Sequence, residues 1–201
     1  SSRVWGGYVT TDLQVLLGVL ATAVLSMPVY VLTGASKRPD ALASGAQGTF
    51  VLGSFVRSWL YWTVSPVVRA SLAVGLGPTF YNLLGVAFGI GAGVAFASGN
   101  VTLGGWGVLL GGMADVLDGR IARAGGLADA RGAFLDSTLD RFAEIGAFVG
   151  LAVLFRSSPF TLAMVVIAMG GALLVSYARA RGESQGVVCK LGVMQRAERL
   201  L

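Results

Sequence analysis

The sequence predicts an all-α protein, a polytopic bundle of transmembrane helices with one amphipathic helix at the cytoplasmic surface of the membrane. The first observation is composition: 55% of the 201 residues are hydrophobic and 12% are charged, against about 25% charged residues in an average soluble domain. The second is a mean hydropathy of +0.75, concentrated in apolar runs of the length that crosses a bilayer. The third is the 30 glycines, since small residues let transmembrane helices approach closely.

The composition also limits the possible chemistry. The chain has no histidine and one cysteine, Cys189, which excludes a histidine-based zinc or iron site, a Ser-His or Cys-His pair and an internal disulfide. Catalysis would have to use carboxylates, arginine, lysine, tyrosine or hydroxyl groups. In a soluble protein the net charge of +5 would favour nucleic-acid binding. In a membrane protein it favours contact with anionic headgroups or with a phosphorylated substrate, and we expect no nucleic-acid partner.

The first apolar run covers residues 13–33. It predicts a transmembrane helix with a kink at Pro28, and Lys37 and Arg38 after it place its C-terminal end in the cytoplasm. A signal peptide is the alternative, although the flanking residues do not fit one. The polar residues 34–49 follow as a loop and form the best domain boundary.

Residues 50–74 mix aromatic side chains with isolated arginines. This pattern predicts an amphipathic helix on the cytoplasmic face, broken at Pro66. The alternative is a buried helix of a soluble core. Beyond it the sequence predicts four more spanning helices, which makes five in all. The expected helices and connections are a span at 79–97, a loop at 98–105, a helix at 106–124, a turn at 125–131, a helix at 132–155, a turn at 156–159, a span at 160–178 and a basic cytoplasmic segment to the end.

Five aspartates lie between residues 115 and 140, in a chain that is otherwise largely apolar. Asp115 and Asp118 share one face of a helix, and Asp136 and Asp140 share one face of the next, because steps of three and four residues return to the same side. Four carboxylates on neighbouring helices suit a hard divalent cation such as Mg²⁺ or Mn²⁺. The alternative is a set of structural ion pairs with Arg120, Arg123, Arg131 and Arg141.

These residues read D-x-x-D-G-x-x-A-R, then eight residues, then G-x-x-x-D-x-x-x-D. The pattern resembles the signature of the CDP-alcohol phosphotransferase family at every fixed position. The matching residues are Asp115, Asp118, Gly119, Ala122, Arg123, Gly132, Asp136 and Asp140. The resemblance begins near Ser54, so we expect an N-terminal helix and loop outside the family match over 1–49 and the family domain over 50–201. Family cores have six helices, which implies that the last two are absent here.

The resemblance implies transfer of a phosphatidyl group from CDP-diacylglycerol to an alcohol, with release of CMP. It implies two Mg²⁺ or Mn²⁺ ions held by Asp115, Asp118, Asp136 and Asp140, with Asp140 also acting as general base. The donor would contact six residues: Thr79, Asn82, Asp118, Gly119, Arg123 and Gly132. The family has Pro-Asn-x-x-Thr where this chain has Pro78-Thr79-x-x-Asn82, so the two polar residues are exchanged.

A basic cluster after the last span is the candidate acceptor site. Its residues are Arg179, Arg181, Arg196 and Arg199. The segments SYARARGE and KLGVMQRAER resemble bacterial phosphatidylinositol-phosphate synthases of the family, which implies inositol 1-phosphate as the acceptor. Glycerol 3-phosphate, serine and free inositol remain alternatives. The cluster is equally compatible with a membrane anchor that follows the positive-inside rule.

Two other classes compete with the enzyme. A cation transporter or channel would use the acidic cluster as a transit site but would not need Gly119, Ala122 and Arg123, and a noncatalytic scaffold would not need intact aspartates. Gly132 fits helix packing nearly as well as substrate approach, and Asp129 fits a solvated turn. For the enzyme we expect the bacterial cytoplasmic membrane, an active site facing the cytoplasm, contact with membrane lipids and a homodimer.

Overall fold

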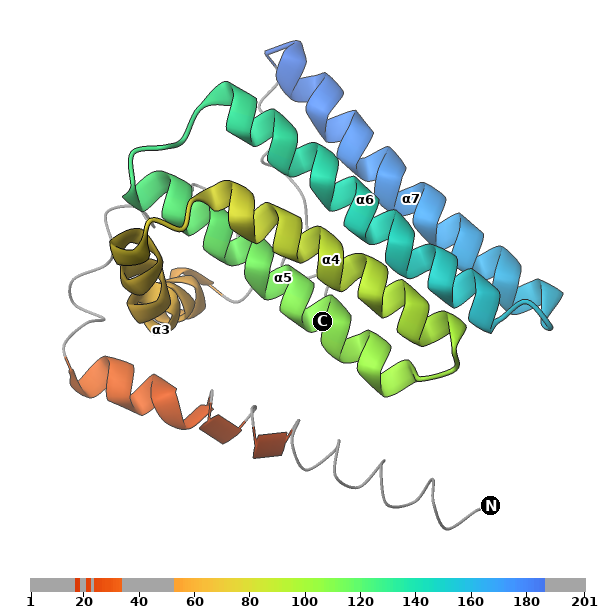
Figure 1. The fold of residues 1–201 in the computed structure, drawn as a ribbon, viewed down its shortest axis with the longest axis horizontal. Coiled ribbons are helices and arrows are strands. Elements are labelled where there is room, and N and C mark those ends of the chain that lie inside the picture. Colours follow the sequence, from red (N-terminus) through yellow and green to blue (C-terminus); the bar gives the residue numbers. More distant parts are fainter. Residues whose placement is uncertain (1–16, 19–20, 23, 34–52, 187–201) are drawn as a thin grey trace. The chain divides into compact units, whose positions relative to one another are not determined.

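The computed structural model describes residues 17–18, 21–22, 24–33 and 53–186 (Figure 1). These residues contain helices and no strands, which confirms the all-α prediction. The chain divides into two compact units, Ser1–Ser65 with Val193–Leu201, and Pro66–Gly192. Helix α3 (Gly53–Val74) begins in the first unit and ends in the second.

In the first unit, the residues described between 17 and 32 are helical, as expected for the first apolar run. This segment packs on the N-terminal half of α3. The ring of Tyr30 lies 5.6 Å from the rings of both Phe55 and Trp62, and Trp59 Nε1 donates a hydrogen bond of 3.0 Å to Ser26 Oγ. The kink at Pro28 and the membrane insertion of this segment stay predictions.

The expected break at Pro66 is wrong, because α3 is one helix with Pro66 inside it. A proline lacks the N–H that would bond the carbonyl four residues earlier, which is that of Trp62. Here Ser65 Oγ donates to the Trp62 carbonyl oxygen at 2.8 Å. The side chain next to the proline therefore supplies a donor to the carbonyl that the proline leaves free.

The second unit contains most of the expected family domain. Its helices are the end of α3, α4 (Pro78–Ala97), α5 (Val101–Ala124), α6 (Ala130–Leu154) and α7 (Pro159–Ser184). Within this unit α4 packs extensively against both α5 and α6, and α7 contacts α6 (Figure 1). Since short turns join successive helices, the start of α4, the end of α5 and the start of α6 meet at one end of the bundle.

Several helix boundaries differ from the predicted ones. The loop expected at 98–105 is only 98–100, because Asn100 caps α5 by accepting a hydrogen bond of 3.0 Å from the Leu103 backbone N–H. Gly104, which reads as a loop residue, is buried within α5, where an added Cβ would collide with the ring of Phe96. Helix α6 begins two residues earlier than expected, and α7 continues six residues further, to Ser184.

Glycines determine how closely α4 and α6 approach. A Cβ added to Gly89 would come within 2.6 Å of Ala143, and one added to Gly150 would collide with the backbone of Gly93. The two backbones are therefore in direct contact, as expected where small residues line a transmembrane helix interface. This contact brings the N-terminal part of α6 alongside the N-terminal part of α4.

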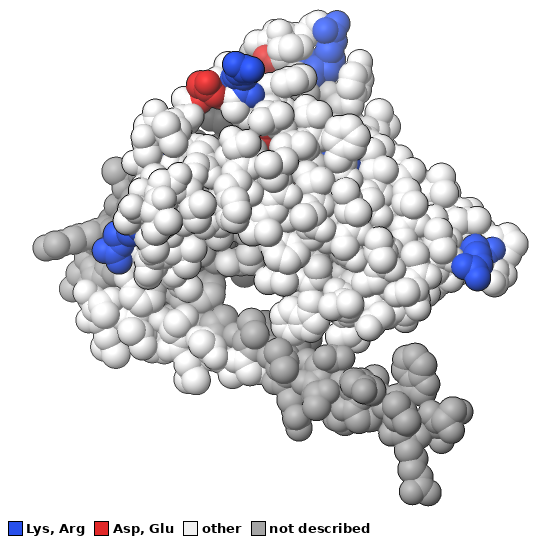
Figure 2. Space-filling model, in the orientation of Figure 1, with Lys and Arg blue, Asp and Glu red and all other residues white. Residues whose placement is uncertain are grey.

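The described helices are compatible with a membrane protein. Among the described helices, α4 and α7 are long and apolar enough to cross a bilayer by length and composition. Helices α5 and α6, with 24 and 25 residues, have the length of a span, and their insertion in the membrane stays a prediction. Figure 2 shows a face whose described surface is almost entirely uncharged, with the few charged side chains at its margins. This distribution is typical of a helical membrane protein.

Candidate active site

Two local features position the start of α4. Helix α3 ends at Gly75, which has a φ of +78°, and the Leu76 N–H bonds the Ser71 carbonyl oxygen at 2.9 Å. This is the turn that glycine allows at the C-terminus of a helix. Pro78 then occupies the first position of α4, where its missing N–H has no consequence.

A small core of buried residues supports the start of α4. The hydroxyl groups of Ser71 and Tyr81 lie 2.6 Å apart and are buried. Val68, Tyr81 and Ile121 pack together, and Ile121 is fully buried. These contacts join the end of α3 to α4 and α5, and they fix the position of the first turn of α4, which carries Thr79 and Asn82.

The end of α5 and the start of α6 are joined by residues 125–129. Gly126 has a φ of +65°, and the Leu127 N–H bonds the Ala122 carbonyl oxygen at 2.8 Å, which ends α5 in the manner of Gly75. Asp129 then caps α6 by accepting a hydrogen bond of 2.6 Å from the Gly132 N–H. The turn thus places Asp136 of α6 opposite the aspartates of α5.

Three carboxylates meet where α5 and α6 face each other. One oxygen from each of Asp115, Asp118 and Asp136 can be chosen so that all lie within 4.8 Å of one another. Asp118 is buried, with 4% of its surface exposed. At the outer limit of 4.8 Å, two ionised carboxylates would repel by about 3.5 kcal/mol at an effective dielectric constant of ~20, so a bound cation would relieve a substantial repulsion.

The donor set fits a divalent cation. All three ligands are oxygen atoms, which Mg²⁺ and Mn²⁺ prefer. Two ligands at ~2.1 Å from an ion lie at most ~4.2 Å apart, so the observed limit of 4.8 Å requires only a sub-ångström closure. Asp140 is not one of these three residues and lies one turn further along α6, with its Oδ2 3.9 Å from Arg141 Nη2.

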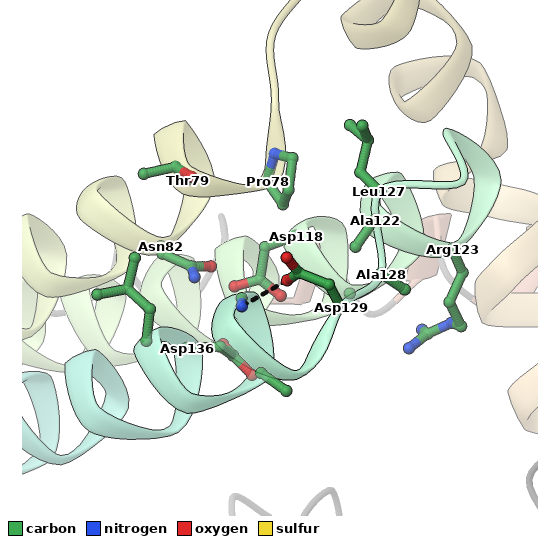
Figure 3. Close-up of a pocket in the computed structure, with 14 residues that line it drawn as sticks. Pro78, Thr79, Asn82, Asp118, Ala122, Arg123, Leu127, Ala128, Asp129 and Asp136 are labelled. Carbon is green, nitrogen blue, oxygen red and sulfur yellow. Dashed lines mark hydrogen bonds between the residues drawn. The ribbon is translucent and has the colours of Figure 1, made fainter.

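A pocket of about 170 Å³ opens beside the cluster (Figure 3). All six residues expected to contact the donor line this pocket: Thr79, Asn82, Asp118, Gly119, Arg123 and Gly132. Pockets that enclose drug-sized ligands usually measure ~300–1,000 Å³. The enclosed space therefore suits a fragment of a large donor, such as a pyrophosphate, while the rest of the donor extends outside it.

The exchanged Thr79 and Asn82 both reach the pocket. Thr79 is exposed at its edge, and Asn82 is buried, with 9% of its surface exposed. The amide end of Asn82 points toward Asp118 in Figure 3, and its Oδ1 has no hydrogen-bond partner among the described residues. A buried amide oxygen without a partner is costly, so Asn82 is available to a ligand in this pocket.

Gly119 and Gly132 have different surroundings. A Cβ at Gly119 would lie 3.2 Å from Arg123 Nη1, so this glycine leaves room for the guanidinium that faces the pocket. A Cβ at Gly132 would lie 2.8 Å from Asp129 Oδ1, so this glycine accommodates the helix cap. Asp129 is exposed, as expected for a turn, but it also caps α6 and lines the pocket. An aspartate immediately before a helix is the signal that identifies such a cap.

The structure places the acceptor candidates only in part. Arg179 and Arg181 lie near the end of α7, within the helix rather than beyond it. Arg179 Nε pairs with Glu183 Oε1 at 2.9 Å, and both side chains are more than half exposed. Arg196 and Arg199 lie outside the described residues. Of the structural ion pairs considered as an alternative, the contact between Arg141 and Asp140 is present at 3.9 Å.

Known proteins are similar to this chain in sequence. The archaetidylinositol phosphate synthase of Methanothermobacter thermautotrophicus is 35% identical over 142 residues, which cover 68% of this chain and 71% of that protein. The phosphatidylinositol phosphate synthase of Cutibacterium acnes is also 35% identical over 142 residues, which cover 69% of each chain.

Solved structures agree with the sequence relatives. The phosphatidylinositol phosphate synthase of Mycobacterium tuberculosis with CDP-DAG bound matches with a TM-score of 0.59 and 31% identity, over 67% of this chain and 70% of that one. Its complex with manganese and citrate matches with a TM-score of 0.62 and 31% identity, over 68% of each chain. The family model for CDP-alcohol phosphatidyltransferases matches residues 76–201. The chain therefore belongs to the CDP-alcohol phosphatidyltransferase family.

Proposed function

We propose that this membrane enzyme transfers the phosphatidyl group of CDP-diacylglycerol to inositol 1-phosphate and releases CMP. The observation that carries the proposal is the shared position of two features. Asp118 and Asp136 belong both to the carboxylate cluster and to the pocket lined by all six expected donor contacts. The relatives named above are inositol phosphate synthases that differ in the archaetidyl or phosphatidyl group, which favours inositol phosphate as the acceptor.

The acidic residues and Arg123 would have different roles in binding CDP-diacylglycerol. Asp115, Asp118 and Asp136 would hold two Mg²⁺ or Mn²⁺ ions together with Asp140. Bound ions supply charge neutralisation at the pyrophosphate, which is the main requirement of phosphoryl transfer. Arg123 would donate hydrogen bonds to the same phosphates, and the guanidinium fork suits that task. Asn82 would accept a hydrogen bond from a hydroxyl or amino group of CDP-diacylglycerol at its amide oxygen, which has no partner among the described residues.

Asp140 would act as the general base. Its carboxylate takes the proton from the acceptor hydroxyl while the hydroxyl oxygen forms a bond to the lipid-bearing phosphorus. The bond from that phosphorus to the oxygen of CMP breaks, and CMP carries away the negative charge. Asp140 lies one turn beyond Asp136 on α6, a distance of about 6 Å along the helix. The acceptor hydroxyl would therefore lie next to the pocket that binds CDP-diacylglycerol. Arg179, Arg181, Arg196 and Arg199 would bind its phosphate.

The acceptor assay offers inositol 1-phosphate, free inositol, glycerol 3-phosphate and serine to purified enzyme with CDP-diacylglycerol and Mg²⁺. We expect turnover with inositol 1-phosphate. For Arg181→Ala the acceptor KM should rise about tenfold or more, since a charge-assisted hydrogen bond contributes ~1.5–3 kcal/mol. The matched control is Arg156→Ala. Arg156 is exposed and follows the C-terminal end of α6, at the end of the bundle opposite to the site. Preference of the wild type for an unphosphorylated alcohol would refute the proposed acceptor.

The proposed orientation places the site at the cytoplasmic face of a bacterial membrane. Eleven of the fifteen basic residues lie in or beside residues 50–74, 115–141 and 179–199, as the positive-inside rule requires for one cytoplasmic side. In a Cys189→Ser background, Ala130→Cys should react with an impermeant maleimide only in inverted vesicles. Ser98→Cys, in the turn at the opposite end of α4, should react in intact cells. The reverse pattern would refute the orientation.

A further inference from the structure

The guanidinium of Arg141 joins α6 to α7. Its Nη1 donates a hydrogen bond to Ser176 Oγ on α7 and lies 2.9 Å from Glu144 Oε2, one turn further along α6. Its Nη2 lies 3.9 Å from Asp140 Oδ2. The side chains of Arg141 and Glu144 are 25% and 29% exposed, so both are about three-quarters shielded from solvent.

Helix α7 has little else to fix its position. None of its residues is buried within the described structure, and its packing in this unit is against α6. Apolar contact alone sets the rotation and register of a transmembrane helix weakly, because lipid tails compete equally well for an apolar face. A charge-assisted hydrogen bond with a defined geometry provides the directional link that such contact lacks.

The contact between Arg141 and Ser176 lies between the proposed general base on α6 and the proposed acceptor-binding residues on α7. Arg141 directly follows Asp140, the proposed base, and Ser176 lies three residues before Arg179 on the same helix. Three residues correspond to about one helical turn. We propose that Arg141, held by Glu144, is a positioning residue that sets the acceptor-binding end of α7 relative to Asp140. This inference rests on the proposed function, because it assumes that α7 carries the acceptor contacts.

Arginine and lysine should differ in this role. The guanidinium presents several donors in a fixed plane, so one group can reach Glu144 and Ser176 together, whereas an ammonium on a flexible stem holds neither direction. If Arg141 merely neutralised Glu144, lysine would replace it fully. If it positions α7, lysine would restore only part of the activity.

The test compares Arg141→Lys, Arg141→Gln, Ser176→Ala and the double variant Arg141→Gln/Ser176→Ala, with Arg156→Gln as matched control. The acceptor is whichever alcohol the wild type uses, so failure of inositol 1-phosphate in the wild type counts against the proposed function alone. We expect Arg141→Gln to raise the acceptor KM at least fivefold, with the CDP-diacylglycerol KM within twofold of wild type. The acceptor KM of Arg141→Lys should lie between those of the wild type and Arg141→Gln. The acceptor KM of the double variant should equal that of the more impaired single variant.

A second readout does not depend on turnover. Amide hydrogen exchange in detergent should become faster in the last two turns of α7 in Arg141→Gln, while α4 and α5 keep wild-type protection. An unchanged acceptor KM, an equal rise in both KM values, full rescue by lysine or unchanged exchange in α7 would each overturn the inference. Arg141 would then be an ion-pair partner of Glu144 without a positioning role.

Discussion

The contact between α4 and α6 can be tested by adding a single methyl group. In Gly93→Ala the new Cβ would collide with the carbonyl oxygen of Gly146 and would lie 2.8 Å from its carbonyl carbon. Carbon atoms in contact normally lie ~3.5–4.0 Å apart, so α4 and α6 must separate by at least about 0.7 Å. The atoms involved belong to the backbone, and no flexible side chain can move aside.

The consequence can be estimated from overpacking and from the geometry of the site. Overpacked positions typically cost ~1–3 kcal/mol of stability. A shift near 1 Å at catalytic groups can reduce the rate about 100-fold. Since α4 carries Asn82 and α6 carries Asp136 and Asp140, we expect Gly93→Ala to lose both stability and most of its activity.

Gly91→Ala is the matched control, because Gly91 lies on the same helix and, apart from the adjacent backbone of α4, no atom of the described residues lies within 4 Å of its added Cβ. Alanine is ~0.5–1 kcal/mol more favourable than glycine inside a helix, so this variant should be as stable as wild type or slightly more. Unfolding in mixed detergent micelles and turnover would be measured for both variants. Equal stability and activity of Gly93→Ala and Gly91→Ala would refute the close approach of α4 and α6.

Three further predictions concern single groups. Excess EDTA, or Asp118→Asn, should abolish turnover because the carboxylate cluster would no longer hold its ions; full turnover in EDTA would contradict this. Tyr81→Phe should cost about 0.5–1.5 kcal/mol of stability, since the buried hydrogen bond between the two hydroxyl groups is lost while Ser71 keeps its bond to the Val67 carbonyl oxygen, and it should raise the CDP-diacylglycerol KM through Asn82; calorimetry and kinetics would detect both. Asn100→Ala should cost ~1 kcal/mol through loss of the α5 cap with unchanged KM values, because the cap lies at the far end of α5.

The sequence predicted the site better than it predicted the helix ends. Steps of three and four residues predict that Asp115 and Asp118 share a face of α5 and that Asp136 lies on the matching face of α6, because helical periodicity is local and strong. The packing of the two helices then brings these three carboxylates together, whereas Asp140 lies outside the group. The six expected donor contacts come from the family resemblance, and the structure places all six around one pocket although Thr79 and Asn82 are exchanged. Neither signal pointed to Asp129 or to the link between Arg141 and Ser176, which depend on a cap and on a contact 35 residues apart in the chain.

The observed start of α5 differs from the predicted one at a pair of glycines. Glycine is unfavourable inside a soluble helix, yet α5 begins at Val101 and includes Gly104 and Gly105, which lie in the predicted loop at 98–105. In this protein Gly104 lies inside α5 because the ring of Phe96 occupies the space of its missing side chain. A packing constraint between two helices therefore outweighed a local preference that the sequence does show.

Pro66 illustrates the same limit and yields a last prediction. In Ser65→Ala the Trp62 carbonyl oxygen loses the hydroxyl that bonds it at 2.8 Å, and we expect a loss of about 1 kcal/mol. In a Pro66→Ala background the restored N–H can bond that carbonyl, so Ser65→Ala should then have almost no effect. The unfolding free energies of the four proteins form a double-mutant cycle. Equal effects of Ser65→Ala in both backgrounds would mean that the hydroxyl does not compensate for the proline, and the continuity of α3 through Pro66 would need another cause.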